Sequence, residues 1–237
     1  MAAGIDAPRV FMPKVDGLHG GRVGPRSRTR TDPRTGACLL GNSVSPCFTP
    51  GTLIATDLGQ RPVETLRKGD KVVTRDNGLR RIHWVGSRGF GYQELVAEDK
   101  IKPVLVRAGA FGEDCPRRDM VVSPHHRFLV GGTYSPLVYE TDEALVSARH
   151  LIDNKKIVPA NMLGVTYLHI LCARHEVILA NGVWTESFHP DDTIMKGLGR
   201  HQRTEILSLF PEIATQGAAR RFPAARKIID RSTNFDG

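Results

Sequence analysis

The chain has 237 residues and a formal net charge of +8, with 33 Lys and Arg residues against 25 Asp and Glu. This length is enough for a sizeable core, in one domain with tails or in two small domains. The apolar runs are too short to span a membrane, and the first residues lack the apolar stretch of a secretory signal. We therefore expect a soluble protein, either cytoplasmic or exported without such a signal.

Much of the positive charge lies in residues 1–46 and in the residues after 190. Neither region contains a nucleic-acid-binding motif or aromatic residues interleaved with the basic ones. We interpret both regions as basic tails and disfavour a nucleic-acid ligand.

The cysteines show no Cys-x-x-Cys pair and are widely and irregularly spaced. They are Cys38, Cys47, Cys115 and Cys172. This spacing disfavours a disulfide framework and predicts free thiols.

Residues 1–46 are rich in Arg, Gly and Pro without a hydrophobic period, which predicts a disordered arm. From Thr52 onward the apolar residues recur in short runs. Hairpin turns are indicated by Asn-Gly at residues 77–78 and 181–182. Strands are predicted at 71–75, 80–86, 104–107, 120–123, 128–130, 157–158 and 166–172, each rich in β-branched or aromatic residues. The pattern predicts an all-β domain.

Helices are predicted at few places. Residues 140–151 are the one inner candidate, with acidic residues near the start and apolar Leu145 and Leu151. After Phe188 the strand pattern ends, and residues 203–210 read as a short amphipathic helix. Residues 218–229 contain Pro223 and form a weak helix at best. We divide the chain into an arm (1–46), a domain (47–190) and a helical basic tail (191–237).

Cys47 lies at the boundary between the arm and the first strand-forming residues. It opens the sequence Cys-Phe-Thr-Pro-Gly-Thr at residues 47–52, which the apolar run 53–55 follows at once. The thiol of a cysteine that begins a folded unit can reach the carbonyl of the residue before it, here Pro46. The sequence therefore offers a nucleophile next to a peptide bond of its own chain.

This opening resembles Hint (hedgehog/intein) domains, and in pattern most resembles bacterial Hint proteins that begin Cys-Phe-x-Pro-Gly-Thr. Residues 69–72, Gly-Asp-Lys-Val, match the family's next strand. Residues 121–130 look like its Thr-x-x-His block, with Ser123 for the Thr and His126 for the His. Residues 175–182 are similar to its late block, which His175 begins. The resemblance implies a horseshoe of short strands and self-processing chemistry.

That chemistry needs three groups at the bond between Pro46 and Cys47. The Cys47 thiol attacks the Pro46 carbonyl to form a thioester. An imidazole protonates the departing amide nitrogen, a role for His126. Ser123 orients the amide or its oxyanion. The resemblance assigns the same roles, whereas the adjacent His125 would face the other way in a strand.

Residues 169–175 form a His-x-x-Cys-x-x-His series through His169, Cys172 and His175. On a helix this spacing would favour zinc, but residues 167–171 favour a strand, where neighbouring ligands diverge. We therefore expect no metal and no cofactor. His169 falls near a catalytic Asp of inteins and His175 matches the block His, so the resemblance implies that either assists acyl transfer.

The end of the predicted domain departs from inteins. Where an intein ends in His-Asn before a nucleophile, this chain has Glu186-Ser187 and continues. We therefore expect N-terminal cleavage without splicing by a monomer, with its own N-terminal segment as substrate and water, a thiol or an alcohol as acceptor. Two alternatives remain open: a non-cleaving Hint scaffold that serves as a binding or secretion module, consistent with Pro46 before the nucleophile, and a hydrolase acting in trans through Cys47 and His126.

Overall fold

A computed structural model describes residues 45–131 and 143–229, which belong to one compact unit, Cys38–Gly237. The predicted disordered arm therefore lies outside the described residues except for its last two. Among the helices of the described ranges, none is long and apolar enough to cross a membrane.

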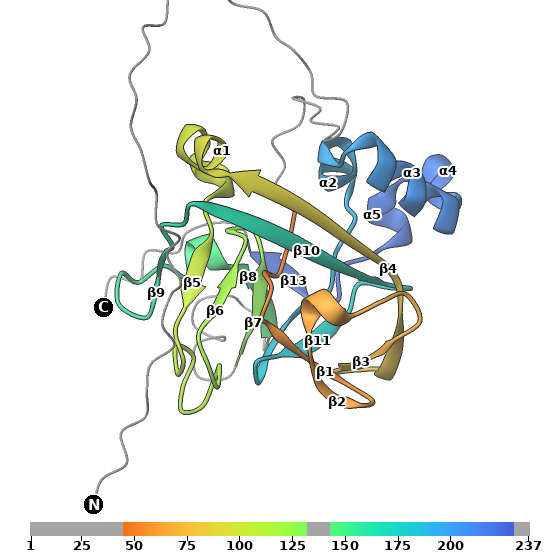
Figure 1. Ribbon diagram of the computed structural model, residues 1–237. Helices are drawn as coiled ribbons and strands as arrows, with labels where there is room; N and C mark the ends of the chain where they lie inside the picture. Colours follow the sequence, from red (N-terminus) through yellow and green to blue (C-terminus); the bar gives the residue numbers. More distant parts are fainter. Residues whose placement is uncertain (1–44, 132–142, 230–237) are drawn as a thin grey trace, which may run out of the picture. The chain divides into compact units, whose positions relative to one another are not determined.

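The described residues form mainly β-structure, which confirms the predicted all-β fold (Figure 1). The larger sheet has the order β10-β4-β3-β1-β11-β12-β7-β8-β13, with β2 paired to β1, and the smaller one has the order β6-β5-β9. The strands are β1 (Leu53–Thr56), β2 (Gly59–Pro62), β3 (Lys71–Thr74), β4 (Gly78–Gly91), β5 (Val104–Val106), β6 (Met120–Val122), β7 (Arg127–Gly131), β8 (Glu143–Ser147), β9 (Ile157–Pro159), β10 (Gly164–Cys172), β11 (Val177–Ala180), β12 (Val183–Glu186) and β13 (Lys227–Ile229).

Both predicted hairpins are present. Asn181 and Gly182 join β11 to β12 with φ angles of 48° and 83°, and Gly78 begins β4 with φ of 64°. Asn and Gly adopt positive φ more readily than other residues, which is why this dipeptide marks a tight turn. The turns fix the register, so alternate residues of β1 and β3 face the core, including Ile54 and Val72.

Strands β4 and β10 form a long antiparallel ladder that carries part of the site (Figure 1). In β4, Ile82, Trp84 and Gly86 are buried at alternate positions. The Trp84 ring lies over Gly86, since a Cβ there would come within 2.1 Å of the indole. In β10 nearly every side chain is buried, as expected of a strand covered on both faces.

The helix predicted at residues 140–151 is wrong for the part that the structure describes. Residues 143–147 form strand β8, and a 3-10 turn, Ala148–His150, follows. The run Ala144-Leu145-Val146 is fully buried because β8 lies between β7 and β13. A short apolar run of this kind is ambiguous in sequence, and here pairing on both edges decides for a strand.

The α-helix α1 (Tyr92–Ala97) follows β4, and the other α-helices of the described residues follow Phe188. The helix predicted at 203–210 is present as α3 (Arg200–Leu209). It is accompanied by α2 (Asp192–Gly197), α4 (Glu212–Gln216) and α5 (Ala218–Arg221). Their apolar side chains form one cluster with Trp84, Leu171 and Phe188 of the β-structure.

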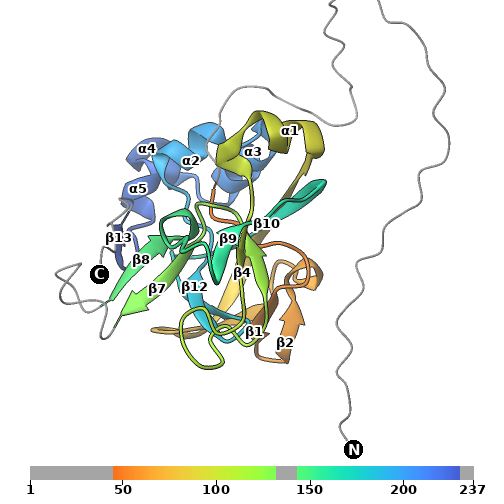
Figure 2. The same ribbon diagram turned by 90° about the vertical axis from the view of Figure 1, so that its left-hand side faces the viewer.

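The last described segment differs from the weak helix predicted at 218–229. Only α5 is helical, and after Pro223 the chain runs into β13, which pairs in parallel with β8 (Figure 2). Proline cannot continue a helix, and the extended residues that follow it pair with the edge of β8. Arg226, just before β13, forms ion pairs with Asp76 and Glu143. The division of the chain into arm, domain and tail stays a prediction.

Candidate active site

Cys47 is held between two strands through its neighbour Phe48. The Phe48 N–H donates to Leu168 O at 2.9 Å, and the Leu168 N–H donates back at 2.8 Å. A second bridge joins Phe48 to Val122 at the end of β6. Phe48 is 2% exposed and belongs to the main core, so the position of Cys47 is fixed by packing as well as by hydrogen bonds.

Ser123 contacts the nitrogen of the Pro46–Cys47 peptide bond. The Cys47 N–H donates to Ser123 Oγ at 3.0 Å, and Ser123 Oγ donates to Ser45 O at 2.9 Å. The Ser123 N–H in turn donates to Cys47 O at 3.1 Å. Ser123 follows β6 directly, so the strand positions its hydroxyl at this amide.

His169 contacts the other side of the same peptide bond. Its Nδ1 lies 3.2 Å from Pro46 O and 3.4 Å from Cys47 Sγ. The thiol donates to Ser45 O at 2.8 Å. His169 is 3% exposed, and its ring is stacked on Trp84 with centroids 6.0 Å apart. One imidazole nitrogen is therefore within reach of both the nucleophile and the oxygen of the carbonyl group that the nucleophile would attack.

Burial sets the protonation states of these two groups. It raises the pKa of the Cys47 thiol to about 12, against hydrogen bonds with Ser45 and Ser123 that lower it. It lowers the pKa of His169 to about 4, against the hydrogen bond with Pro46 O that raises it. At neutral pH the pair is thus a thiol beside a neutral imidazole.

His126 is buried in the turn between β6 and β7, with its ring 4.4 Å from that of Phe48. Thr185 Oγ1 donates its only proton to Arg127 O at 2.7 Å, so the Nε2–H of His126 must be the donor in its contact with Thr185. Nδ1 then carries the lone pair and has no partner among the described residues. Burial lowers the pKa of His126 to about 4. Among the hydrogen bonds of the described residues, none joins this ring to Cys47.

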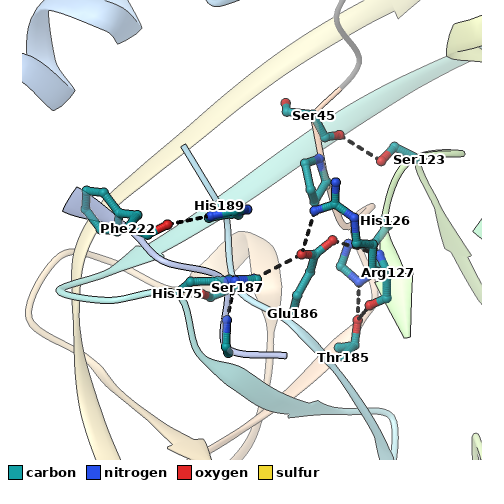
Figure 3. A network of polar contacts seen from close by, with 12 residues as sticks. Ser45, Ser123, His126, Arg127, His175, Thr185, Glu186, Ser187, His189 and Phe222 are labelled. Atoms are coloured by element: carbon teal, nitrogen blue, oxygen red, sulfur yellow. Dashed lines mark hydrogen bonds and ion pairs between the residues drawn. The ribbon is translucent and has the colours of Figure 1, made fainter. Parts of the chain in front are cut away.

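His175 lies in a second buried cluster (Figure 3). Its Nδ1 accepts from the Ala225 N–H at 3.1 Å, so Nε2–H donates to Glu186 Oε2 at 3.0 Å. Arg127 holds the same carboxylate through its backbone N–H at 2.9 Å and its guanidinium at 3.1 Å. His189 stacks on His175 at 4.2 Å. Burial alone would raise the pKa of Glu186, but Arg127 and His175 keep it below its usual value.

Three parts of this arrangement were not predicted: Ser45 as a partner of Cys47 and Ser123, the ion pair of Arg127 with Glu186, and His189. The only available signal was a charged residue at one end of each of two apolar strands, Arg127 at the start of β7 and Glu186 at the end of β12. Such residues are rarely buried unless paired, but their pairing depends on contacts between strands far apart in sequence.

The three residues that could have formed a zinc site, His169, Cys172 and His175, lie in different surroundings. His169 lies at Cys47, His175 lies at Glu186, and Cys172 is buried after an irregularity in the pairing of β10 with β4. Within residues 45–131 and 143–229, no three His, Cys, Asp or Glu side chains converge as metal ligands would.

These buried histidines predict how stability depends on pH. His126, His169 and His189 each have a pKa of about 4, lowered by burial from an unfolded value of about 6.5. Between these values the unfolded chain binds more protons, so stability is full above pH 6.5 and is lost as pH falls towards 4. The urea concentration at the midpoint of unfolding should be lower at pH 5 than at pH 7. An unchanged midpoint would show that these imidazoles are not buried in neutral form.

A family model described as the Hint domain matches residues 46–192. No curated protein matches the chain. Similar solved structures include the gp41-1 intein (11% identity, 60% of this chain and 98% of that chain, TM-score 0.36). They also include a bacterial intein-like domain from Clostridium thermocellum (14% identity, 61% of this chain and 99% of that chain, TM-score 0.40). A third is a DnaB intein from Synechocystis sp. PCC 6803 (14% identity, 60% of this chain and 99% of that chain, TM-score 0.36).

Proposed function

Because the chain belongs to the Hint-domain family, we propose that it shifts the Pro46 acyl group from the Cys47 nitrogen to the Cys47 sulfur, and so releases its own N-terminal segment without splicing. The observation that supports this most is the enclosure of one peptide bond: Ser123 contacts its nitrogen, and His169 contacts its oxygen and the thiol. The family's self-processing acyl-shift chemistry gives the reaction class.

The first step is attack by sulfur on the Pro46 carbonyl carbon. With a pKa of about 12, only about one Cys47 thiol in 10⁵ is ionised at pH 7, so a base at the sulfur is needed. His169 Nδ1–H donates to Pro46 O, so the other ring nitrogen, Nε2, which lies 3.7 Å from Cys47 Sγ, takes the thiol proton as the S–C bond forms. The resulting imidazolium N–H then faces the developing oxyanion on Pro46 O, where charge is stabilised most in a buried site.

The second step breaks the C–N bond and needs a proton on the Cys47 nitrogen. The His169 imidazolium gives up the thiol proton to that nitrogen, so the thiol proton ends on the new amine, and Ser123 Oγ, which accepts a hydrogen bond from the Cys47 N–H, orients the nitrogen. The product is a Pro46–Cys47 thioester with a free Cys47 amino group. Water, a thiol or an alcohol then attacks the thioester carbon, releases residues 1–46 and restores the thiol.

His126 packs behind this centre, and its unpaired Nδ1 is the remaining buried imidazole lone pair near Phe48. We expect His126→Ala to slow cleavage by about 10²-fold, the lower end of the range for a positioned acid or base. His125→Ala, in the adjacent partly exposed position, should change the rate much less. Rates are measured by loss of the intact chain on denaturing gels, with circular dichroism to verify folding. The reverse ranking would mean that His125 is the residue that assists.

The absence of splicing follows from Glu186. Asn cyclisation needs a side-chain amide nitrogen, and the Glu186 carboxylate has none. Arg127 and His175 hold this carboxylate, and the hydroxyl of the following residue, Ser187, accepts from the Glu176 N–H at 3.0 Å. The geometry thus favours an inert end to the domain.

We therefore expect the segment after Glu186 to stay attached to Cys47 under every condition that produces cleavage. Mass spectrometry of the reaction should show no fragment that begins at Ser187 and no ligated product lacking residues 47–186. Either species would restore a full intein mechanism. A chain that remains intact with thiol, by contrast, would support the non-cleaving scaffold.

A further inference from the structure

A cavity of about 900 Å³ lies between α3 and β4, apart from the contacts of Cys47. Its apolar lining includes Trp84 and Val85 of β4, Leu66 and Leu209. Gln202 of α3 donates to Ser87 O at 3.0 Å and helps to hold this helix beside β4. Pockets of roughly 300–1,000 Å³ are the usual size for small ligands.

The rim of the cavity carries unpaired positive charge. Among the ion pairs of the described residues, none involves Lys68 or Arg200, which both line the cavity. The Arg67 guanidinium donates only to the backbone carbonyls of Glu64 and Leu66. Three guanidinium or ammonium groups therefore line the cavity without a carboxylate partner among the described residues.

The one carboxylate in the lining does not neutralise this rim. Glu205 Oε2 accepts from Trp84 Nε1 at 2.7 Å, and Oε1 lies 3.3 Å from His201 Nδ1. The pKa of His83, also in the lining, is lowered by burial first and then by the positive charge of Lys68 and Arg221. The cavity thus combines an apolar floor with a net positive rim.

We propose that this cavity binds a small amphipathic anion, with an aromatic or aliphatic body against Val85 and Leu209, both partly exposed, and a carboxylate, sulfonate or phosphate between Lys68 and Arg200. An anion would supply the counter-charge that the described residues do not, and an apolar body would cover the apolar part of the lining. Trp84, which lines the cavity, also stacks on His169, so the ligand lies one side chain from the candidate active site.

Binding is tested on the Cys47→Ala chain, so the result does not depend on the cleavage chemistry. The probe is 1-anilinonaphthalene-8-sulfonate, followed by energy transfer from tryptophan, and the matched uncharged probe is N-phenyl-1-naphthylamine. We expect one saturable site that binds the sulfonate about tenfold or more tightly than the neutral probe, a difference of about 1.4 kcal/mol. Equal affinity for the two probes would overturn the proposal.

Charge-reversal variants locate the site. Lys68→Glu combined with Arg200→Glu should weaken sulfonate binding by about tenfold or more. The control pair Arg149→Glu with Lys155→Glu changes the net charge equally at exposed positions on other elements and should leave binding unchanged. Thr204→Trp, on the α3 wall of the cavity, should abolish binding of both probes by filling the space. Unchanged binding in the Lys68 and Arg200 pair, or in Thr204→Trp, would place the probe elsewhere and refute the site.

Discussion

Replacing Cys47 with alanine is expected to abolish cleavage between Pro46 and Cys47. The described residues offer no other thiol at this bond: Cys115 contacts Gly182 O at 3.8 Å, and Cys172 is buried in β10. Without the sulfur there is no thioester, and an amide is not opened by added thiol at a useful rate. The measurement is the intact mass of the variant after prolonged incubation with dithiothreitol, and the expected result is a single unchanged mass.

Cys115→Ala is the matched control, because it removes a partly buried thiol away from Pro46 and should cleave like the unmodified chain. Cleavage of Cys47→Ala at the normal rate would rule out the acyl shift altogether. Cleavage that is lost in both variants would point to a folding defect, which circular dichroism distinguishes from a chemical one.

Replacing His169 with alanine is expected to slow cleavage by about 10²- to 10⁴-fold, the usual effect of removing a positioned acid or base. Its Nδ1 is the imidazole nitrogen within 3.4 Å of the thiol and 3.2 Å of the carbonyl oxygen. His169→Gln retains a hydrogen-bond donor of similar reach but accepts no proton, so it should recover little of the rate. Single-turnover rates of residues 1–46 release measure the effect.

The pH dependence distinguishes this role from a structural one. His169 must be neutral to take the thiol proton, and burial lowers its pKa to about 4. The acyl-shift rate of the folded protein should therefore show no inflection near pH 6.5 and should stay level down to the pH at which circular dichroism shows loss of the fold. A rate that halves near pH 6.5, or a His169→Gln variant with the normal rate, would contradict the assignment.

Local signals in the sequence predicted much of the fold. The Asn-Gly turns depend on backbone preferences of two residues, and the strand predicted at residues 80–86, now part of β4, depends on its own β-branched and aromatic residues, so both could be predicted without tertiary information. The same reasoning failed at residues 143–147, because a three-residue apolar run has no period, and only its pairing with β7 and β13 selects a strand.

The site likewise combines residues that local motifs predicted with contacts that depend on distant segments of the chain. Cys47 and Ser123 belong to motifs that are local in sequence, and the structure brings them to one peptide bond. The nearness of His169 to that bond depends on the pairing of Phe48 with Leu168, which joins segments far apart in the chain. The pairing of Glu186 with Arg127 likewise depends on β12 lying beside β7. The pattern of a single sequence does not predict contacts of this kind, and only the family resemblance indicated His169.

The central claim is that Cys47 takes over the acyl group of Pro46, and the intact mass of the unmodified protein during incubation with dithiothreitol tests it most directly. We predict loss of the full-length mass and the appearance of two products, residues 1–46 released as a thiol adduct or its hydrolysed acid, and residues 47–237 with a free N-terminal cysteine. A mass that stays constant, or a cut at any bond other than Pro46–Cys47, would contradict the account.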